Sequence, residues 1–334
     1  MPENVTLWLP TADQTAQAGA SLSNTLYNRQ LTIGLSGDLG AGKTTFLQGF
    51  LRALGVADHV ASPTFALEQR YHINHGELLH LDLYRLSPAQ AAELIAQSHD
   101  FPGIRCIEWA DRLPDRTHLD QPLLFIEIQE ESVERRCDIL FDDISLPSAE
   151  DIDRWRREVL LPSHIAAHCD AVASLCQSLA ESLIKSGNIV RPLALKKSAE
   201  VHDLFRFVDF RANAGPSDFQ HTQKEKDTWQ PWKERYPGLR HEAVCTAFLR
   251  EKGYPELAGI VAAHGLRLPP SDQATIEQKL LYYADKRVIV DRIVSLDERF
   301  ADFAERYGDG PDAYMGKVWL EEARRVEREL GMMN

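Results

Sequence analysis

The 334-residue sequence contains no apolar run that approaches the roughly 20 residues needed to cross a bilayer. Its opening residues lack a basic stretch followed by an apolar core, so we expect no secretion signal. The five cysteines are an odd number and include no C-x-x-C pair, which argues against a disulfide framework. The sequence has no internal repeat and no low-complexity tract. These absences predict a cytoplasmic protein, and the length predicts two domains.

Basic residues are scarce in the first half of the sequence. Residues 1–150 contain 10 Lys+Arg against 21 Asp+Glu, a net charge of −11, whereas residues 151–334 contain 27 against 29, a net charge of −2. An acidic surface is a poor partner for a polyanion. If RNA is involved in the function, we expect the first half to contact a protein that holds the RNA.

A phosphate-binding pattern is present, because residues 37–44 read GDLGAGKT and fit G-x-x-x-x-G-K-T. An apolar run at 31–35 precedes the pattern and helical spacing follows it at 45–54, which predicts a strand, a glycine turn and a helix. In such a loop the backbone N–H groups and the helix N-terminus surround an anion. Lys43 is then expected to reach the β- and γ-phosphates while the Thr44 hydroxyl ligates Mg²⁺. The pattern predicts binding of a nucleoside triphosphate.

Three further signals follow the loop. Ser62-Pro63-Thr64-Phe65 reads as a turn whose hydroxyls could sense the γ-phosphate, although an ordinary Ser-Pro turn would look the same. Asp82 ends an apolar strand, and Glu108 ends another. Each carboxylate alone fits a solvated strand end equally well. Together with the phosphate-binding loop, they favour a magnesium site.

These motifs, in this order, closely resemble the bacterial TsaE family, the ATPase subunits of the tRNA threonylcarbamoyladenosine biosynthesis machinery. The resemblance covers about residues 1–147 and implies an α/β P-loop NTPase domain. It rests on GDLGAGKTTF at 37–46, SPTF at 62–65, HLDLYR at 80–85 and Glu108-Trp109.

The resemblance implies roles for particular residues. Lys43 and Thr44 would bind phosphates and metal, Thr64 would belong to a switch segment, and Asp82 and Glu108 would serve metal binding and catalysis of hydrolysis. It also implies ATP and Mg²⁺ as ligands, and the TsaD and TsaB proteins as partners, with tRNA contacted only indirectly. ATP hydrolysis would reset that complex between turnovers. The residues expected at the nucleotide are Asp38, Leu39, Gly40, Ala41, Gly42, Lys43, Thr44, Thr45 and Thr64.

The second half is helical in pattern and carries a spaced series of histidines and aspartates. A lone histidine on a helix is more often structural than a ligand. A series inside apolar helices is different, because imidazole and carboxylate together suit Fe, Mn, Zn or Ni. The series is His168 within 165–173, His202-Asp203 on an expected helix at 195–207, His241, His264, and Asp285 within 280–287.

This order resembles the HD superfamily of metal-dependent phosphohydrolases over about residues 160–300. His168, His202, Asp203 and Asp285 match its core metal site, and His241 and His264 fall where binuclear members place further ligands. Arg206 matches a position that often faces the substrate phosphate. Residues 210–240 depart from the family as a long, turn-rich segment. Its basic and aromatic residues could cap a nucleotide substrate, contact RNA or form a solvated loop. They are Arg211, Lys224, Lys226, Trp229, Trp232, Lys233 and Arg235.

We therefore expect an α/β P-loop NTPase domain over residues 1–147 followed by an all-α HD domain over residues 148–334. The predicted function is ATP hydrolysis in tRNA threonylcarbamoyladenosine synthesis together with a metal-dependent phosphohydrolase activity on a nucleotide or phosphate ester. An alternative makes the HD half a non-catalytic nucleotide sensor that regulates the ATPase. A small-molecule kinase is disfavoured, because no arginine-rich lid is evident after the loop helix.

Overall fold

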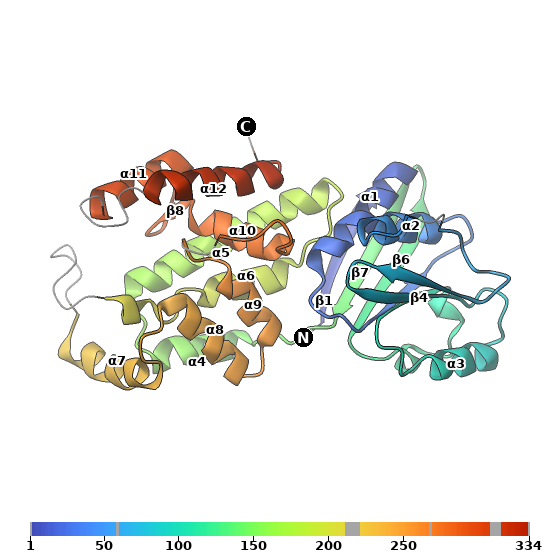
Figure 1. Cartoon of the computed structure of the whole chain (residues 1–334), viewed down its shortest axis with the longest axis horizontal. Helices are drawn as coiled ribbons and strands as arrows, with labels where there is room; N and C mark the ends of the chain where they lie inside the picture. Colours follow the sequence, from blue (N-terminus) through green and yellow to red (C-terminus); the bar gives the residue numbers. More distant parts are fainter. Residues whose placement is uncertain (1, 58–59, 211–220, 267–268, 308–314, 333–334) are drawn as a thin grey trace. The chain divides into compact units, whose positions relative to one another are not determined.

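The computed structural model describes residues 2–57, 60–210, 221–266, 269–307 and 315–332 (Figure 1). The chain divides into two compact units, one formed by Met1–Ile144 with Glu181–Arg191 and the other by Ser145–Ala180 with Pro192–Asn334. The sequence predicted a single boundary after residue 147 and did not anticipate that Glu181–Arg191 belongs to the first unit. Among the described residues, no helix combines the length and the apolar character that a membrane span needs.

The first unit is built on a mixed sheet with the strand order β1-β7-β6-β2-β5-β4-β3. Strands β6, β2, β5 and β4 run parallel to one another, while β1, β7 and β3 pair antiparallel with their neighbours. Strand β2 is buried at every position, as its continuous apolar run predicts for a central parallel strand. The strands are β1 Glu3–Leu9, β2 Leu31–Ser36, β3 Glu68–Ile73, β4 Gly76–Asp82, β5 Ile104–Glu108, β6 Leu123–Glu131 and β7 Glu134–Asp142.

Helices cover both faces of this sheet. Phe46 and Phe50 of α2 (Lys43–Ala53) belong to the apolar core on one face, together with Leu22 of α1 (Ala12–Leu22). Helix α3 (Pro88–Gln97) contributes to the core on the other face. Short 3₁₀ turns occupy Ser23–Thr25, Ala110–Arg112 and Arg116–His118.

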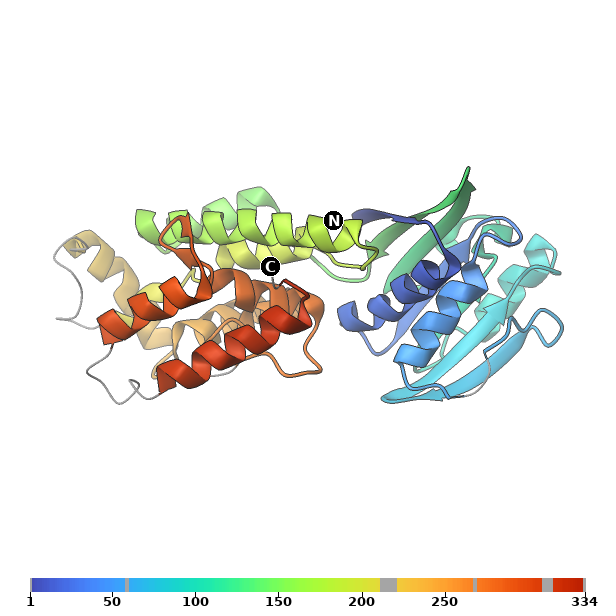
Figure 2. The ribbon, with the colours of Figure 1, turned by 90° about the horizontal axis from the view of Figure 1, so that it is seen from above.

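Helices α1 and α2 lie side by side (Figure 2) and approach closely at two glycines. A Cβ added at Gly19 would lie 1.9 Å from the Phe46 carbonyl oxygen, and one at Gly49 would lie 1.8 Å from the Ala16 carbonyl oxygen. Side chains at either position would therefore force the helices apart. This packing fixes the helix that begins at the phosphate-binding loop.

The segment Glu181–Arg191 is attached to the first unit by a buried ion pair. Both side chains of Arg191 and Asp143 are fully buried, and Arg191 Nη2 donates to Asp143 Oδ2 at 2.8 Å. Arg191 Nε also donates to Thr25 Oγ1 at 3.0 Å. The backbone N–H of Ile189 donates to Ser21 Oγ at 2.9 Å. These bonds make the segment a structural part of the first unit.

The second unit is mainly helical, with a short β8–β9 hairpin that the expected all-α domain did not include. Helices α11 and α12 lie side by side (Figure 1). The elements that begin in this unit are α4 Ala149–Glu158, α5 Ser163–Lys185, α6 Pro192–Val201, the 3₁₀ turn Arg206–Asp209, α7 Gln223–Arg235, α8 His241–Glu251, α9 Pro255–Ala262, α10 Ile276–Asp285, β8 Val288–Ile289, β9 Arg292–Ile293, α11 Leu296–Tyr307 and α12 Met315–Glu329. The last residues of α5, from Glu181, belong to the first unit.

Two local predictions in this unit were wrong. The helix expected at 195–207 ends at Val201, because the next turns use i→i+3 hydrogen bonds, such as Leu204 N–H to the Val201 carbonyl. The segment expected to be turn-rich contains α7, which begins with a capping box between Thr222 and Glu225.

Trp229 of α7 belongs to the core, whereas Trp232 is half-buried. Trp229 is buried, stacks on Phe207 with ring centroids 5.0 Å apart, and donates its indole N–H to the Val159 carbonyl at 2.7 Å. Trp232 packs edge-on against Phe205 at 5.2 Å. Arg211, another residue of the expected cap, lies outside the described residues.

Candidate functional site

The phosphate-binding loop joins the end of β2 to the start of α2, as the sequence predicted. Gly37 has a φ of +134°, and a Cβ there would lie 2.0 Å from the Ile128 carbonyl oxygen. Gly42 caps α2 with a φ of +112°. Both positions therefore require glycine, for backbone conformation and, at Gly37, also for space. Of the remaining predicted loop residues, Asp38, Leu39 and Gly40 are exposed, Ala41 is buried, and Thr44 and Thr45 are half-buried.

Lys43 lies inside the curve of the loop. Its Nζ donates to the carbonyls of Gly37 at 2.7 Å and Asp38 at 2.9 Å, and it lies 3.6 Å from the ring centroid of Trp109. Burial lowers the pKa of the Lys43 ammonium, against the opposing effect of nearby carboxylates, Glu108 first. The ammonium is thus largely desolvated and available to pair with an anion in the loop.

Parallel pairing brings the two predicted carboxylates to the edge of the sheet where the loop begins. Glu108 pairs in register with Leu35 of β2 on one side and with Asp82 of β4 on the other. Both carboxylates end their strands at this edge, and the Glu108 side chain contacts Thr44, the second residue of α2. The carboxyl ends of parallel strands are the expected location of a ligand site in such a sheet.

Glu108 is held between two side chains. The Thr44 hydroxyl donates to Glu108 Oε2 at 2.8 Å, and His80 Nε2 lies 2.9 Å from Glu108 Oε1. His80 and Glu108 are 0% and 2% exposed. His80 is the first residue of the HLDLYR motif, but the sequence alone assigned it no role.

Asp82 is held by the turn that was expected to act as a switch. Ser62 and Thr64 both donate their hydroxyls to Asp82 Oδ2, Thr64 at 2.7 Å. The backbone N–H of Tyr84 donates to Asp82 Oδ1 at 2.8 Å. Thr44 thus contacts Glu108 and Thr64 contacts Asp82 at the ends of two adjacent strands, and their hard oxygen atoms fit Mg²⁺.

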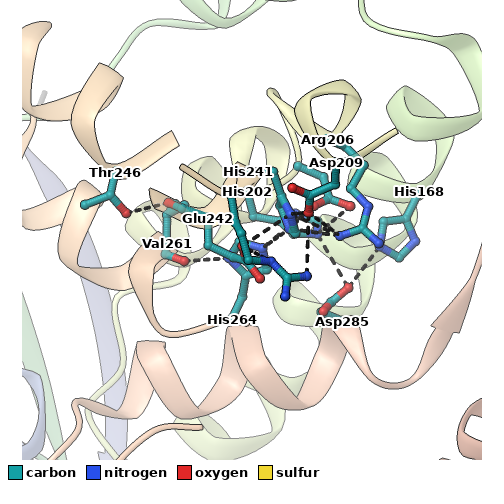
Figure 3. Close-up of polar contacts among 12 residues, drawn as sticks. His168, His202, Arg206, Asp209, His241, Glu242, Thr246, Val261, His264 and Asp285 are labelled. Atoms are coloured by element: carbon teal, nitrogen blue, oxygen red, sulfur yellow. Dashed lines mark hydrogen bonds and ion pairs between the residues drawn. The ribbon is translucent and has the colours of Figure 1, made fainter. Parts of the chain in front are cut away.

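The second unit gathers the predicted histidines and aspartates in its interior (Figure 3). All are less than 9% exposed. His168 comes from α5, His202 and Asp203 from the turn after α6, His241 from the first residue of α8, His264 from the residues after α9, and Asp285 from the end of α10.

The four histidines present the same ring nitrogen to the centre of the cluster. Nδ1 of three of them lies beside a carbonyl oxygen, which only accepts hydrogen bonds, so Nδ1 must carry the proton. Nδ1 of the fourth, His241, lies 2.6 Å from Asp209 Oδ2. The carbonyl partners are Ala199 for His202 at 2.8 Å, Val261 for His264 at 2.5 Å and Val290 for His168 at 3.1 Å.

Val290 holds its carbonyl toward His168 from an unfavourable backbone conformation. Its φ is +57°, which is rare for a β-branched residue. The residue lies in the turn between β8 and β9. Strain of this kind persists where the surrounding structure requires it. The hairpin that the sequence did not predict therefore helps to orient a predicted ligand.

The ligand atoms of the six predicted residues form two groups of three, His168–His202–Asp285 and Asp203–His241–His264. A third possible group within the described residues is Asp209–His241–Glu242. In the first, Asp285 Oδ1 lies 3.0 Å from His168 Nε2 and 3.6 Å from His202 Nε2. In the second, Asp203 Oδ1 lies 3.0 Å from His241 Nε2 and 3.7 Å from His264 Nε2. Asp203 Oδ2 faces the first group, 4.0 Å from His202 Nε2.

The ring nitrogens are poorly satisfied by one another. His202 Nε2 is buried and has no hydrogen-bond partner among the described residues. His241 Nε2 and His264 Nε2 are 3.2 Å apart, so their two lone pairs can share only a proton or a cation. Two ligand atoms about 2.1 Å from one ion lie about 3–3.5 Å apart, which is close to these separations. The donor set therefore fits a transition metal.

The two carboxylates of the cluster are held in the ionised form. Burial alone would raise the pKa of Asp203, but His241 and Arg206 beside it bring the pKa well below its usual value. The pKa of Asp285 is likewise lowered against burial, first by Lys286. Burial lowers the pKa of His264, which keeps that ring neutral. Ionised carboxylates and a neutral imidazole are the forms that bind metal. Against the effect of burial, Cys169 and Asp203 raise the pKa of His202, and Asp203 raises the pKa of His241.

Four further residues with charged side chains contact members of this cluster. The predicted Arg206 lies at its edge, with Nη1 3.1 Å from His241 Nε2. Asp209 and Glu242 both approach His241 Nδ1, at 2.6 and 3.3 Å. Lys286 is buried and donates to Asp285 Oδ2 and, at 2.6 Å, to the His264 carbonyl. Sequence reasoning missed these last three; only the adjacency of Lys286 to Asp285 and of Glu242 to His241 was a usable signal.

The first unit is similar in sequence to a family of known proteins. The sequence model of the Threonylcarbamoyl adenosine biosynthesis protein TsaE matches residues 9–137. The tRNA threonylcarbamoyladenosine biosynthesis protein TsaE of Synechocystis sp. is 41% identical over 124 residues, 34% of this chain and 76% of that protein. Its counterpart in Nostoc sp. is 38% identical over 113 residues, 32% of this chain and 69% of that protein.

A solved structure is also similar. The crystal structure of Bacillus subtilis YdiB is 28% identical in sequence and aligns with a TM-score of 0.34, covering 42% of this chain and 87% of that one.

Proposed function

Because the chain belongs to the TsaE family through its first unit, we propose that this unit hydrolyses ATP in tRNA threonylcarbamoyladenosine biosynthesis. The observation that carries the proposal is the convergence of Lys43, Thr44, Asp82 and Glu108 at one sheet edge. Loop N–H groups and Lys43 would hold the phosphates. Thr44, Asp82 and Glu108 would hold Mg²⁺, which supplies charge neutralisation on the phosphoryl oxygens.

The TsaD and TsaB proteins are the proposed partners. The net charge of −11 over residues 1–150 supports a protein partner over direct contact with tRNA. The test is ATP turnover by the full chain, with and without the TsaD–TsaB assembly and with Mg²⁺ omitted as a control. Turnover that needs Mg²⁺ and rises with the assembly supports the proposal. Absence of turnover in every condition contradicts it.

We infer that the second unit is a metal-dependent phosphohydrolase acting on a nucleotide or phosphate ester. The observation that carries this inference is that Nε2 of four buried histidines faces two ionised carboxylates. His168, His202 and Asp285 would hold one metal ion, and Asp203, His241 and His264 a second. Bound metal supplies a water of lowered pKa as nucleophile.

The protein side chains would position this chemistry. Asp203 presents one oxygen to each group of ligands, which suits a bridging carboxylate. Arg206 is partly exposed at the edge of the cluster and carries the guanidinium that would orient a phosphate. Asp209 and Glu242 accept from His241 Nδ1 and raise the basicity of its Nε2.

A non-catalytic nucleotide sensor remains the alternative for this unit, and one experiment separates it from an enzyme. The full chain is reconstituted with Mn²⁺, Fe²⁺, Ni²⁺ or Zn²⁺ and assayed for phosphate release from a nucleotide panel, and binding of each nucleotide is measured in parallel. Metal-dependent phosphate release supports the hydrolase. Nucleotide binding without phosphate release under any metal supports the sensor.

A further inference from the structure

His80 is a fully buried histidine whose ring forms a hydrogen bond with the carboxylate of Glu108. It lies on β4, two residues before Asp82, so both side chains leave the strand on the same face. Cys106 of β5 is its register partner, and Glu108 lies two residues further along β5 on the same face. Glu108 therefore lies between the His80 ring and Thr44, each of which contacts one of its carboxylate oxygens.

The hydrogen-bond pattern identifies the proton that joins the two side chains. His80 Nε2 lies 2.9 Å from Glu108 Oε1, and Nδ1 has no hydrogen-bond partner among the described residues. A buried N–H without an acceptor costs more than an unused imidazole lone pair, because the N–H loses a hydrogen bond to water. The hydrogen bond is therefore donated by Nε2–H to Glu108 Oε1.

We propose that His80 is the positioning residue for Glu108, an inference that rests on the proposed ATP hydrolysis. Its Nε2–H fixes Oε1 and turns Oε2 toward Thr44, whose hydroxyl donates to it at 2.8 Å. Glu108 is thereby held with Oε2 toward the start of α2, where it would support Mg²⁺ or an attacking water. Without His80, Oε1 would be buried without a donor, and the carboxylate would rotate to find one.

The test compares side chains that differ in whether an N–H reaches Glu108. His80→Gln places an amide nitrogen near the position of Nε2, His80→Asn places it short of Glu108, and His80→Leu removes it. We expect Leu and Asn to lower kcat for ATP by about 10- to 100-fold, the usual loss for a residue that orients a metal ligand. Gln should retain most of the activity. The exposed His72 on β3, changed to Leu, is the matched control.

Two readouts do not depend on turnover. Mg²⁺ should strengthen binding of AMP-PNP in the wild type and in His80→Gln but much less in His80→Leu and His80→Asn, while affinity without Mg²⁺ stays similar. In the full chain labelled with ¹⁵N-histidine, the signal lost in His80→Gln should be that of an Nε2–H tautomer. A spectrum with the proton on Nδ1 would overturn the proposal.

The outcomes separate this inference from the proposed function. A wild type without ATP turnover would reject the hydrolysis, and the Mg²⁺ dependence of AMP-PNP binding would then decide the role of His80. Equal losses in Gln and Asn would show that the hydrogen bond does not matter and would overturn the proposal. Wild-type behaviour of folded His80→Leu would do the same. If His80→Leu does not fold, the comparison of Gln with Asn still decides.

Discussion

At the scale of single residues, Lys43 is the side chain on which nucleotide binding most depends. Its desolvated ammonium already bonds to two loop carbonyls, which a bound phosphate would replace as partners. Lys43→Ala should weaken ATP binding and reduce hydrolysis by about 100-fold or more, as expected when one charge-stabilising donor is removed. ATP titration and phosphate release measure both effects.

Two comparisons sharpen this prediction. Arg52→Ala, at the exposed end of the same helix, should leave both quantities unchanged. Asp82→Ala and Glu108→Ala should abolish hydrolysis with a smaller loss of binding than Lys43→Ala, because they support the metal and not the phosphates. Turnover by Lys43→Ala at the wild-type rate would reject the assignment of the loop.

In the second unit, Asp203 is the side chain on which metal binding should most depend, since its two oxygens face different histidines. Asp203→Ala should lose bound transition metal and phosphohydrolase activity together, while ATP hydrolysis at the loop continues. Elemental analysis of freshly purified protein gives the direct measurement. Asp153→Ala, an exposed aspartate of α4, is the matched control and should keep its metal.

The same elemental analysis also tests whether the second unit binds a transition metal at all. If wild-type protein contains no stoichiometric transition metal and none can be restored by Mn²⁺, Fe²⁺, Ni²⁺ or Zn²⁺, the phosphohydrolase proposal is rejected. The non-catalytic nucleotide sensor is then the favoured function of the second unit. Loss of ATP hydrolysis in Asp203→Ala would instead indicate that this substitution disturbs the first unit.

At the scale of elements, the buried pair Arg191–Asp143 joins the segment Glu181–Arg191 to the sheet unit. Removing one member leaves the other charge buried and unpaired, which typically costs about 3–5 kcal/mol. Arg191→Met should lower the free energy of opening of β6 and β7 by about that amount. Amide hydrogen exchange of peptides from these strands measures it within the full chain.

The double variant Arg191→Met/Asp143→Leu tests the cause. Replacing both charges by apolar groups of similar volume is often neutral, so the double variant should regain most of the lost protection. The exposed Arg29→Met should change nothing. Equal losses in the single and double variants would mean that packing of the arginine, and not its charge, attaches the segment.

Elements that depend on neighbouring residues were predictable from the sequence. The strand, glycine turn and helix around Lys43 were, because apolar spacing and glycine positions are local signals. The end of α6 at Val201 was not, since it depends on i→i+3 bonds in a turn that the apolar pattern does not mark. The return of Arg191 to Asp143 was not either, because nothing near either residue in the sequence reveals a partner 48 positions away.

The candidate sites divide in the same way. Ligand types such as His241 and Asp203 are recognisable as a spaced series, but what orients them is not. Nδ1 of His168 is held by the carbonyl of Val290, and any residue type offers that carbonyl. Orienting groups of this kind become visible only when the chain is folded.

At the scale of the whole molecule, the distribution of charge disfavours direct binding to RNA. The chain carries a net charge of −13, of which −11 lies in residues 1–150. Binding to RNA draws its affinity from basic side chains that replace condensed cations, and the first half has few. The full chain should therefore not bind free tRNA at physiological salt. If the proposed function holds, it should co-purify with the TsaD–TsaB assembly, more strongly with ATP.

The measurement is a pull-down of the full chain with the assembly and, separately, with tRNA, each across a range of salt concentrations. Retention by the assembly that survives physiological salt, with no retention by tRNA, fits a surface that meets protein. Tight tRNA binding that weakens steeply with salt would contradict the prediction, because such a slope counts the phosphates neutralised by basic residues. The Lys43→Ala chain completes the design, since it should keep basal binding to the assembly and lose the increase caused by ATP.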